Sequence, residues 1–417
     1  SGKKRDIDIK INESLAQEYL NAETQEARDI VMDKLLEDIA GQIPPSLKDK
    51  WDSWRYLSML GNPRTHIRNI GGNLVFMLPV HLKNTLSYIA EKAIPKGQRT
   101  KSYIKTAESK EFAKQDYIKM KDMIQGNSGK FEGISKINEL RRIYKFKPLE
   151  GLRKANFAAL EWEDGIFLKH HYENALAQIM TARGYTAEFL NSGTNEARAA
   201  LEAARVYAIN EAQKATYRDA NAAAEALSSA QRKLQNHKYF AARAAGLALE
   251  GVVPFKKTPL NIVKRGVEYS PVGLINGVYD MAFNIKSGKA TAAEAIDKLA
   301  SGLVGTALTV LGMWLASVGL VRGDGDDDKN AERLDNVKGE QSYSVRIGKH
   351  SYTIDWVAPV SMPFFVGVNI QKAFASDKKF TFEDIVKALV KIPDPIMSLS
   401  VLSSLSDLLS AGNYADT

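Results

Sequence analysis

Hydrophobic and polar positions follow a helical period along most of the chain. Residues 24–43 are typical of an amphipathic helix, because their apolar side chains fall on one stripe. The stripe consists of Ala27, Ile30, Val31, Leu35, Ile39 and Ile43. Asn12 and Thr24 are expected to cap the first two helices, since short polar side chains accept hydrogen bonds from the amides of a first helical turn. Ser46 is placed in the same way before a further helix over residues 47–60.

An alanine-rich stretch predicts further helices in the middle of the chain. Residues 194–245 contain neither Gly nor Pro, and 19 of the 56 residues from Asn195 to Glu250 are Ala. Alanine has the highest helix propensity, and its small side chain lets neighbouring helices approach closely. We therefore expect one or two long helices in this stretch.

A single β-hairpin is predicted over residues 342–354. Apolar and polar residues alternate on both sides of Gly348 and Lys349, which suit a two-residue loop. The rest of the chain has the helical pattern. The expected fold class is therefore all-α: a multi-helix assembly with long Ala-rich helices, this one small hairpin and an apolar C-terminal helical part.

An uncharged run distinguishes the C-terminal part. Leu299 to Val321 are 23 residues without a charged side chain, and about 20 apolar residues suffice for a helix to cross the hydrocarbon core of a membrane. Small residues recur in this run at helical spacing, a pattern that allows a second helix to approach closely. This candidate seam consists of Gly305, Thr309, Gly312, Ala316 and Gly319. The run is either a membrane helix or the buried helix of a bundle, because both can be apolar on every face.

These patterns divide the chain into four consecutive regions. They are an N-terminal helical region over residues 1–95, a basic helical segment over 96–150, an Ala-rich long-helix region over 151–250 and an apolar C-terminal region over 251–417. The last region contains the candidate membrane helix 299–321 and the hairpin 342–354.

Positive charge is concentrated in the second region. The chain has a net charge of +8, and residues 96–147 alone hold 14 Lys and Arg against six Asp and Glu. Such a block, interleaved with aromatic residues, is typical of surfaces that bind phosphate backbones or anionic lipid, and a solvated helix face gives the same pattern. Arg64 and Arg68 form a further pair on a helix expected to start at Pro63, and an internal acid such as Asp52 is the alternative partner. The candidate nucleic-acid or anion-binding residues are Arg64, Arg68, Lys101, Lys105, Arg141, Arg142, Lys145 and Lys147.

The sequence shows no catalytic pattern. Cysteine is absent, which excludes disulfides, cysteine-bound zinc, iron–sulfur clusters and thiol nucleophiles. A phosphate-binding loop, a nucleophile elbow and a His-Glu-x-x-His zinc helix are absent as well. We therefore expect no enzymatic activity, no cofactor and no metal site.

Three motifs resemble a known family. They are WDSWRYLSMLGNPRTHIRNIGGN over Trp51–Asn73, ATYRDAN over Ala215–Asn221 together with Val252–Leu274, and SYTIDWVAPVSMPFFVG over Ser351–Gly367. Their succession resembles a segment of the large polyvalent proteins of phages and mobile elements. Those proteins are multidomain chains that are carried in virions or delivered with DNA, and the resemblance supplies no catalytic residue.

The resemblance implies a phage structural or delivered protein that acts at the host envelope during genome entry. Together with the apolar run and the basic block, it predicts a phage structural or ejection-type protein that contacts the host membrane, and DNA as well, during genome delivery. Its expected partners are other virion proteins, membrane lipid, DNA and further copies of the chain in a homo-oligomer. Its expected location is the virion and then the host cell envelope. Two alternatives stay open: a soluble, cytoplasmic helical module for structure or interaction whose apolar runs are core, and a nucleic-acid-binding module that uses the basic block.

Overall fold

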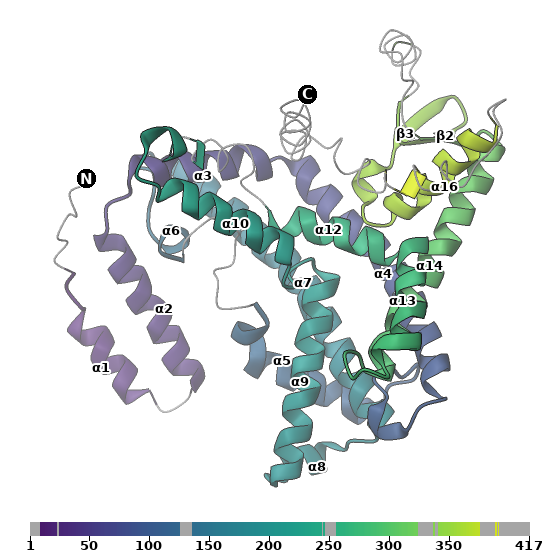
Figure 1. Ribbon diagram of the computed structural model, residues 1–417. Coiled ribbons are helices and arrows are strands. Elements are labelled where there is room, and N and C mark those ends of the chain that lie inside the picture. Colours follow the sequence, from purple (N-terminus) through teal and green to yellow (C-terminus); the bar gives the residue numbers. More distant parts are fainter. Residues whose placement is uncertain are drawn as a thin grey trace. The chain divides into compact units, whose positions relative to one another are not determined.

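The chain is predominantly helical (Figure 1). The structure is a computed structural model that describes residues 9–22, 25–125, 136–243, 245–246, 256–323, 337, 341–375, 388–389 and 391. Within these residues the strands form one small antiparallel sheet. The predicted all-α fold class with a small hairpin is therefore confirmed.

The chain folds into two compact units, each built from separate segments of the sequence. Unit 1 comprises residues 1–66 and 125–164, and unit 2 comprises residues 67–124 and 165–417. The division falls within two long helices, α4 (Pro63–Glu91) and α7 (Lys147–Arg183). The basic segment of the sequence therefore contributes to both units.

Unit 1 consists of helices that begin at polar caps. It contains α1 (Glu13–Asn21), α2 (Gln25–Gln42), α3 (Leu47–Leu60), α6 (Lys136–Leu140) and the first half of α7. The Asn12 side chain accepts hydrogen bonds from the first amides of α1, and Ser46 forms a capping box with Asp49 at the start of α3. Both predicted caps are therefore confirmed. Thr24, the third predicted cap, lies outside the described residues.

In unit 1, α2, α3 and α7 all carry buried apolar side chains. Val31 and Leu35 of α2 are buried, and Tyr56 of α3 packs edge-on against Phe157 of α7 with ring centroids 6.0 Å apart. His66, at the start of α4, lies 2.6 Å from a carboxylate oxygen of Glu163 on α7. Polar and apolar contacts together therefore fix α7 within this unit.

Unit 2 contains the other helices. After α4 come η1 (Lys96–Gln98), α5 (Ala107–Gln125), the second half of α7, α8 (Ala187–Asn191), α9 (Asn195–Ala215) and α10 (Ala222–Gln235). Then follow α12 (Lys257–Glu268), α13 (Pro271–Tyr279), the π-helical η2 (Asp280–Asn284), α14 (Ala292–Ser317), η3 (Asp355–Val357) and α16 (Ser361–Phe374). The Ala-rich stretch thus forms α9 and α10, and residues 240–243 and 245–246 are helical as well, so the stretch contains more helices than the one or two predicted. Ala204, Ala208 and Ala212 of α9 are fully buried in one cluster with α5 and α7.

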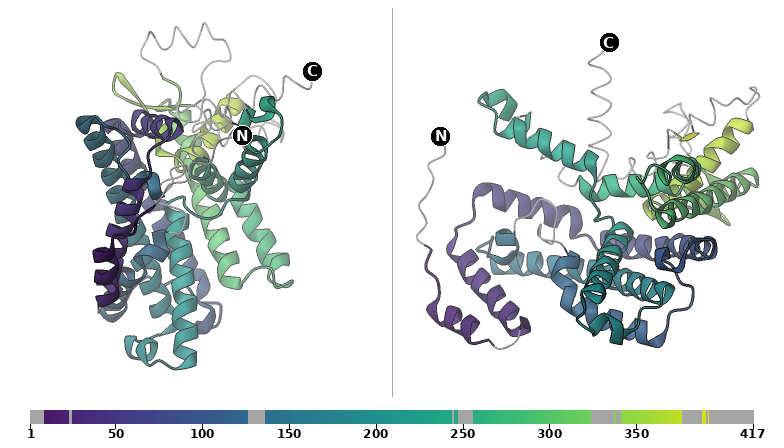
Figure 2. Two further views of the ribbon diagram at one scale, coloured as in Figure 1. Left: turned by 90° about the vertical axis from the view of Figure 1, so that its left-hand side faces the viewer. Right: turned by 60° about the horizontal axis from the view of Figure 1, so that its bottom comes forward.

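The C-terminal helices of unit 2 pack closely around α14. This helix lies against both α13 and α16 (Figure 1, Figure 2). A three-stranded sheet follows, with β1 (Val321–Arg322), β2 (Ser344–Ile347) and β3 (His350–Thr353) in the order β1-β2-β3. The predicted hairpin is confirmed as β2 and β3, whose loop residue Gly348 has a φ of +62°. The strand β1 was not predicted.

The helix α14 ends earlier than the uncharged run from which a helix over 299–321 was predicted. Gly319 has a φ of +72°, and its amide donates to the carbonyl of Ala316. The amide of Leu320 donates to the carbonyl of Leu315, which completes a Schellman motif. The chain then pairs Val321 with Val345 of β2. The last four residues of the run are therefore a helix cap and a strand instead of helix.

Candidate functional site

The small residues of the predicted seam let α14 touch the backbones of its neighbours in unit 2. A Cβ atom added at Gly305 would overlap the backbone between α12 and α13, and one at Gly312 would overlap the carbonyl of Phe364 on α16. The hydroxyl of Thr309 donates to the carbonyl of Pro363 over 3.0 Å. These three seam residues are buried. The structure therefore places the seam against helices of the same chain.

The two other seam residues lie where the packing loosens. Ala316 is half-buried beside a cluster that contains Phe364 and Phe365 of α16. Gly319 lies beyond the helix, and its Cβ position is open. The close contact therefore covers the first three seam residues and fades towards the end of α14.

The opposite face of α14 is apolar and exposed. Val310 and Trp314 keep 58% and 59% of their surface accessible. With their neighbours they form a stripe at spacings of three to four residues, which we call the α14 apolar face: Leu303, Ala307, Val310, Trp314 and Val318. Within the described part of the chain, α14 is the one helix long and apolar enough to cross a membrane. The seam side of α14 is therefore packed against neighbouring backbones, whereas the α14 apolar face is exposed.

The turn before α14 combines aromatic and basic side chains. Tyr279 at the end of α13 and Phe283 in η2 are exposed, and their ring centroids lie 5.0 Å apart. Exposed Lys286 and Lys289 follow in the turn that leads to α14. Aromatic rings beside lysines are typical of groups at a membrane–water interface.

The structure separates the eight predicted anion-binding residues. Arg64 and Arg68 are exposed on α4, which starts at Pro63 as predicted. Arg142, Lys145 and Lys147 are exposed in unit 1. The remaining three predicted residues are drawn into internal contacts, so five of the eight side chains face solvent.

Each of the three internal residues has a polar partner. Arg141 of unit 1 is buried, and its guanidinium lies 2.6 Å from Asp49. In unit 2, Lys105 is half-buried and donates to the side-chain oxygen of Asn174. Lys101 is 2% exposed and lies within an ion-pair cluster. Arg141 and Lys101 therefore do not contribute to an exposed basic surface, because their charges are neutralised inside the protein.

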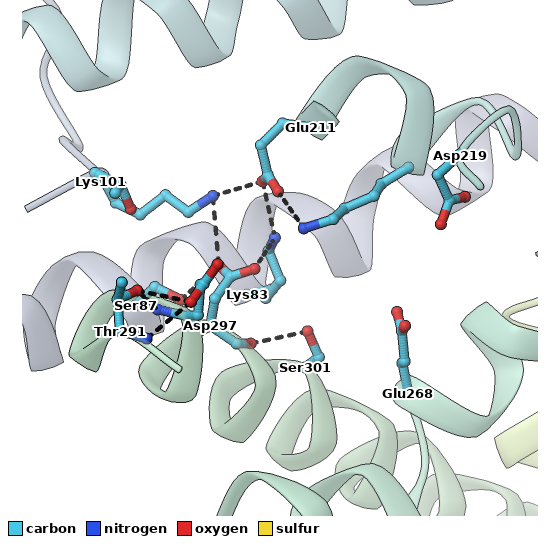
Figure 3. Close-up of polar contacts among 12 residues, drawn as sticks. Lys83, Ser87, Lys101, Glu211, Asp219, Glu268, Thr291, Asp297 and Ser301 are labelled. Atoms are coloured by element: carbon cyan, nitrogen blue, oxygen red, sulfur yellow. Dashed lines mark hydrogen bonds and ion pairs between the residues drawn. The ribbon is translucent and has the colours of Figure 1, made fainter. Parts of the chain in front are cut away.

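Lys101 belongs to a four-residue cluster of alternating charges, which we call the buried quartet (Figure 3). Its ammonium lies 2.7 Å from Glu211 on α9 and 3.3 Å from Asp297 on α14. Lys83 on α4 lies 2.8 Å from Asp297 and 3.4 Å from Glu211. The hydroxyl of Ser87 donates a further hydrogen bond of 3.2 Å to Asp297. The quartet therefore joins α4, α9, α14 and the segment before α5 within unit 2.

Burial and opposite charge compete in the quartet. Burial alone would lower the pKa of Lys83 and Lys101, but the carboxylates of Asp297 and Glu211 outweigh it and raise both pKa values above the ordinary lysine value. Burial alone would raise the pKa of Glu211, but the two ammonium groups hold it well below the ordinary value. All three groups therefore stay charged at neutral pH, and Glu211 has a further partner in Lys214, whose ammonium lies 3.2 Å away.

A cavity of about 520 Å³ adjoins the quartet within unit 2. Lys83, Glu211 and Asp297 line it together with Arg265 and Lys298. The further cations of the lining are also paired: Arg265 with Asp219 and Glu268, and Lys298 with Asp280. Lys214 is paired with Glu211, and Lys264 with Asp219. No group of three His, Cys, Asp or Glu side chains among the described residues is arranged to hold a metal ion. The charged lining is thus neutralised by contacts within the protein.

Sequence reasoning found the seam and the basic residues but missed the acids of the quartet. Asp297 is the last acid before the uncharged run, and Glu211 lies within the Ala-rich stretch. A lone acid beside a long apolar run is the one sequence signal for such a partner, since a charge there needs compensation when it is buried. Nothing in the local pattern connects either acid with Lys101.

Comparison with known proteins leaves the family open. No family model, curated protein or solved structure matches the chain. The resemblance to large polyvalent proteins stays a prediction from the three sequence motifs.

Proposed function

We propose that the chain is a non-enzymatic protein that contacts a lipid membrane through the α14 apolar face. The observation that carries the proposal is this exposed stripe of Leu, Val and Trp on a helix without a charged residue after Lys298. A large exposed apolar patch on a protein marks a surface for a membrane or a partner. In line with the motif resemblance, we further propose a phage structural or ejection-type protein that acts at the host envelope, with virion proteins and DNA as further partners.

The geometry favours contact by one face of α14 over complete insertion of the helix. Gly305 and Gly312 hold the other face against the neighbouring backbones, and Asp297 ties the helix start into the buried quartet. Each half-exposed apolar side chain that enters a hydrocarbon phase contributes about 1 kcal/mol. Several such side chains together are sufficient for the chain to bind a membrane while unit 2 stays folded. Lys286 and Lys289 would then lie beside anionic headgroups.

The soluble interaction module is the second candidate function. The observation in its favour is that the seam packs within the chain, as in the core of a helical bundle. Under this alternative the α14 apolar face would be covered by a protein partner.

Vesicle flotation of the purified chain tests the proposal. We expect the chain to float with vesicles of zwitterionic and anionic phospholipid, and the double variant Val310→Asp, Trp314→Asp to stay in the dense fraction. A matched control is Val206→Asp, an exposed valine on α9 in the same unit. Circular dichroism should show equal helicity for all three proteins. If the parent chain remains in the dense fraction, membrane contact is wrong and the soluble module takes its place.

A further inference from the structure

A pair of exposed tryptophans marks a second surface, in unit 1. Trp51 and Trp54 on α3 keep 56% and 51% of their surface accessible, although tryptophan is normally well buried. Their ring centroids lie 5.2 Å apart at an angle of 31° between the planes. The opposite side of α3 carries the buried residues Asp52, Ser53 and Tyr56. The two indoles therefore lie on the solvent side of a helix that is fixed by its other face.

Residues 138–147, which belong to unit 1, contact the first half of α3. The side chain of Asn138 donates to Asp49 over 2.7 Å, and the guanidinium of Arg141 lies 2.6 Å from the same carboxylate. The hydroxyl of Tyr144 donates to the carbonyl of Lys50 over 2.9 Å. These contacts bring the exposed end of the segment beside the helix turn that carries Trp51.

That end of the segment carries an aromatic ring between cations. Phe146 is 68% exposed, and it is flanked by the exposed side chains of Lys145 and Lys147. Arg142 is exposed as well, and its guanidinium donates to the carbonyls of Tyr144 and Lys145. We call the exposed residues Lys50, Trp51, Trp54, Arg142, Lys145, Phe146 and Lys147 the α3 aromatic–basic surface.

The acids around this surface are already paired. Asp49 binds Arg141, Asn138 and the cap at Ser46. Asp52 is buried and binds Arg55. Glu150 is buried and binds Arg153 and the amide of Tyr144. The exposed lysine and arginine side chains therefore dominate the charge of this surface.

We propose that the α3 aromatic–basic surface binds single-stranded nucleic acid. Unpaired bases stack on exposed aromatic rings irrespective of sequence, while lysine and arginine side chains contact the phosphates. In a duplex the base faces are stacked on one another inside the helix, so the tryptophan rings could not stack on them. This inference deepens the DNA contact of the proposed function, and it rests on residues of unit 1 instead of on α14.

Fluorescence anisotropy with a labelled oligothymidylate of 20 nucleotides is the test, with a duplex of equal length beside it. We expect the chain to bind the single strand more tightly than the duplex. The double variant Trp51→Ala, Trp54→Ala should lose at least about tenfold in affinity, because each stacked base accounts for a comparable factor. The matched control is Trp162→Ala, an exposed tryptophan of α7 in the same unit, which should bind like the parent.

A salt series tests the basic part of the surface. The double variant Lys145→Glu, Lys147→Glu should flatten the slope of log K against log salt by about 0.7 for each lost phosphate contact. Lys154→Glu, at a half-exposed lysine of α7, is the control and should leave the slope unchanged.

Several results would overturn the inference. They are equal binding of single strand and duplex, unchanged affinity of the tryptophan double variant, and loss of vesicle flotation in that variant without any nucleic-acid binding by the parent. The last result would assign the surface to lipid. Flotation that persists while oligonucleotide binding is absent would overturn this inference and leave the proposed membrane contact standing.

Discussion

Burial decides what a basic residue of this chain can do. Lys101 and Lys145 both belong to the basic block of the sequence, yet Lys101 is buried between two carboxylates and Lys145 is exposed. A buried charge depends on its partners, because the interior does not solvate it. An exposed charge is solvated by water and remains available to an anionic ligand.

Lys101→Met should therefore destabilise the chain far more than Lys145→Met. Without Lys101, Glu211 and Asp297 share Lys83, and Glu211 keeps Lys214 as well. Breaking a buried ion pair costs about 3–5 kcal/mol. The free energy of unfolding from urea titrations measures the loss. Lys145→Met should stay within about 0.5 kcal/mol of the parent. A loss below about 1 kcal/mol for Lys101→Met would contradict the role assigned to the quartet.

A buried histidine should make stability depend on pH. Burial, and then the neighbouring His170, lower the pKa of His171 to about 4, with Glu211 acting in the opposite direction and Lys83 in the same one. The ordinary value of 6.5 applies to the unfolded chain. Between these values the unfolded chain binds a proton that the folded chain refuses, so the free energy of unfolding falls as the pH decreases from about 6.5.

His171→Gln should flatten this dependence between pH 7 and pH 5. Urea titrations at several pH values measure it, and a single group changes the free energy of unfolding by at most about 1.4 kcal/mol per pH unit. His350→Gln, at an exposed histidine of β3, is the control and should keep the parent's slope. Equal slopes for His171→Gln and the parent would show that other groups cause the dependence.

At the scale of single elements, the close packing of α14 can be tested with one methyl group. Gly312→Ala places a Cβ atom against the carbonyl of Phe364, so α14 and α16 must move apart. We expect a loss of about 1–3 kcal/mol in the free energy of unfolding, the usual cost of overpacking. Gly151→Ala within α7 is the matched control, since nothing lies near its Cβ position. That variant should be neutral or more stable by about 0.5–1 kcal/mol, because Ala favours helix over Gly.

Local sequence signals predicted the elements well and their partners poorly. The caps at Asn12 and Ser46, the helix start at Pro63 and the loop at Gly348 depend on neighbouring residues alone, and the structure has all of them. The end of α14 differs from the prediction because apolar character alone does not reveal a helix end. There Gly319 adopts a positive φ and the chain pairs with β2, which lies more than twenty residues farther along.

In the candidate site, too, the sequence did not show which partners the predicted residues contact. The spacing of Gly305 and Gly312 predicted a close approach, but the helices that approach come from distant segments. Lys101 and Arg141 were expected among surface cations because their acids, Glu211 and Asp49, lie far away in the sequence. Trp51 and Trp54 show the opposite difference from the two cations. Apolar residues at helical spacing are expected to be buried, but these two side chains are exposed.

At the scale of the whole molecule, the two proposed binding surfaces lie in different units. The α14 apolar face belongs to unit 2, and the α3 aromatic–basic surface belongs to unit 1. The two surfaces share no residue, and each is supported by contacts within its own unit. Mutations at one surface should then leave the other intact, because substitutions that share no partners act independently.

A crossed experiment with the two double variants tests this independence. Val310→Asp, Trp314→Asp should abolish vesicle flotation and keep the parent's affinity for oligothymidylate. Trp51→Ala, Trp54→Ala should show the reverse pattern, with normal flotation and at least about tenfold weaker oligonucleotide binding. Adding the oligonucleotide to the flotation assay then asks whether one chain holds both ligands at once, and we expect labelled oligonucleotide to rise with vesicles only when the parent chain is present. If either variant loses both activities while its helicity is unchanged, the surfaces are coupled and the separation of functions between the units is wrong.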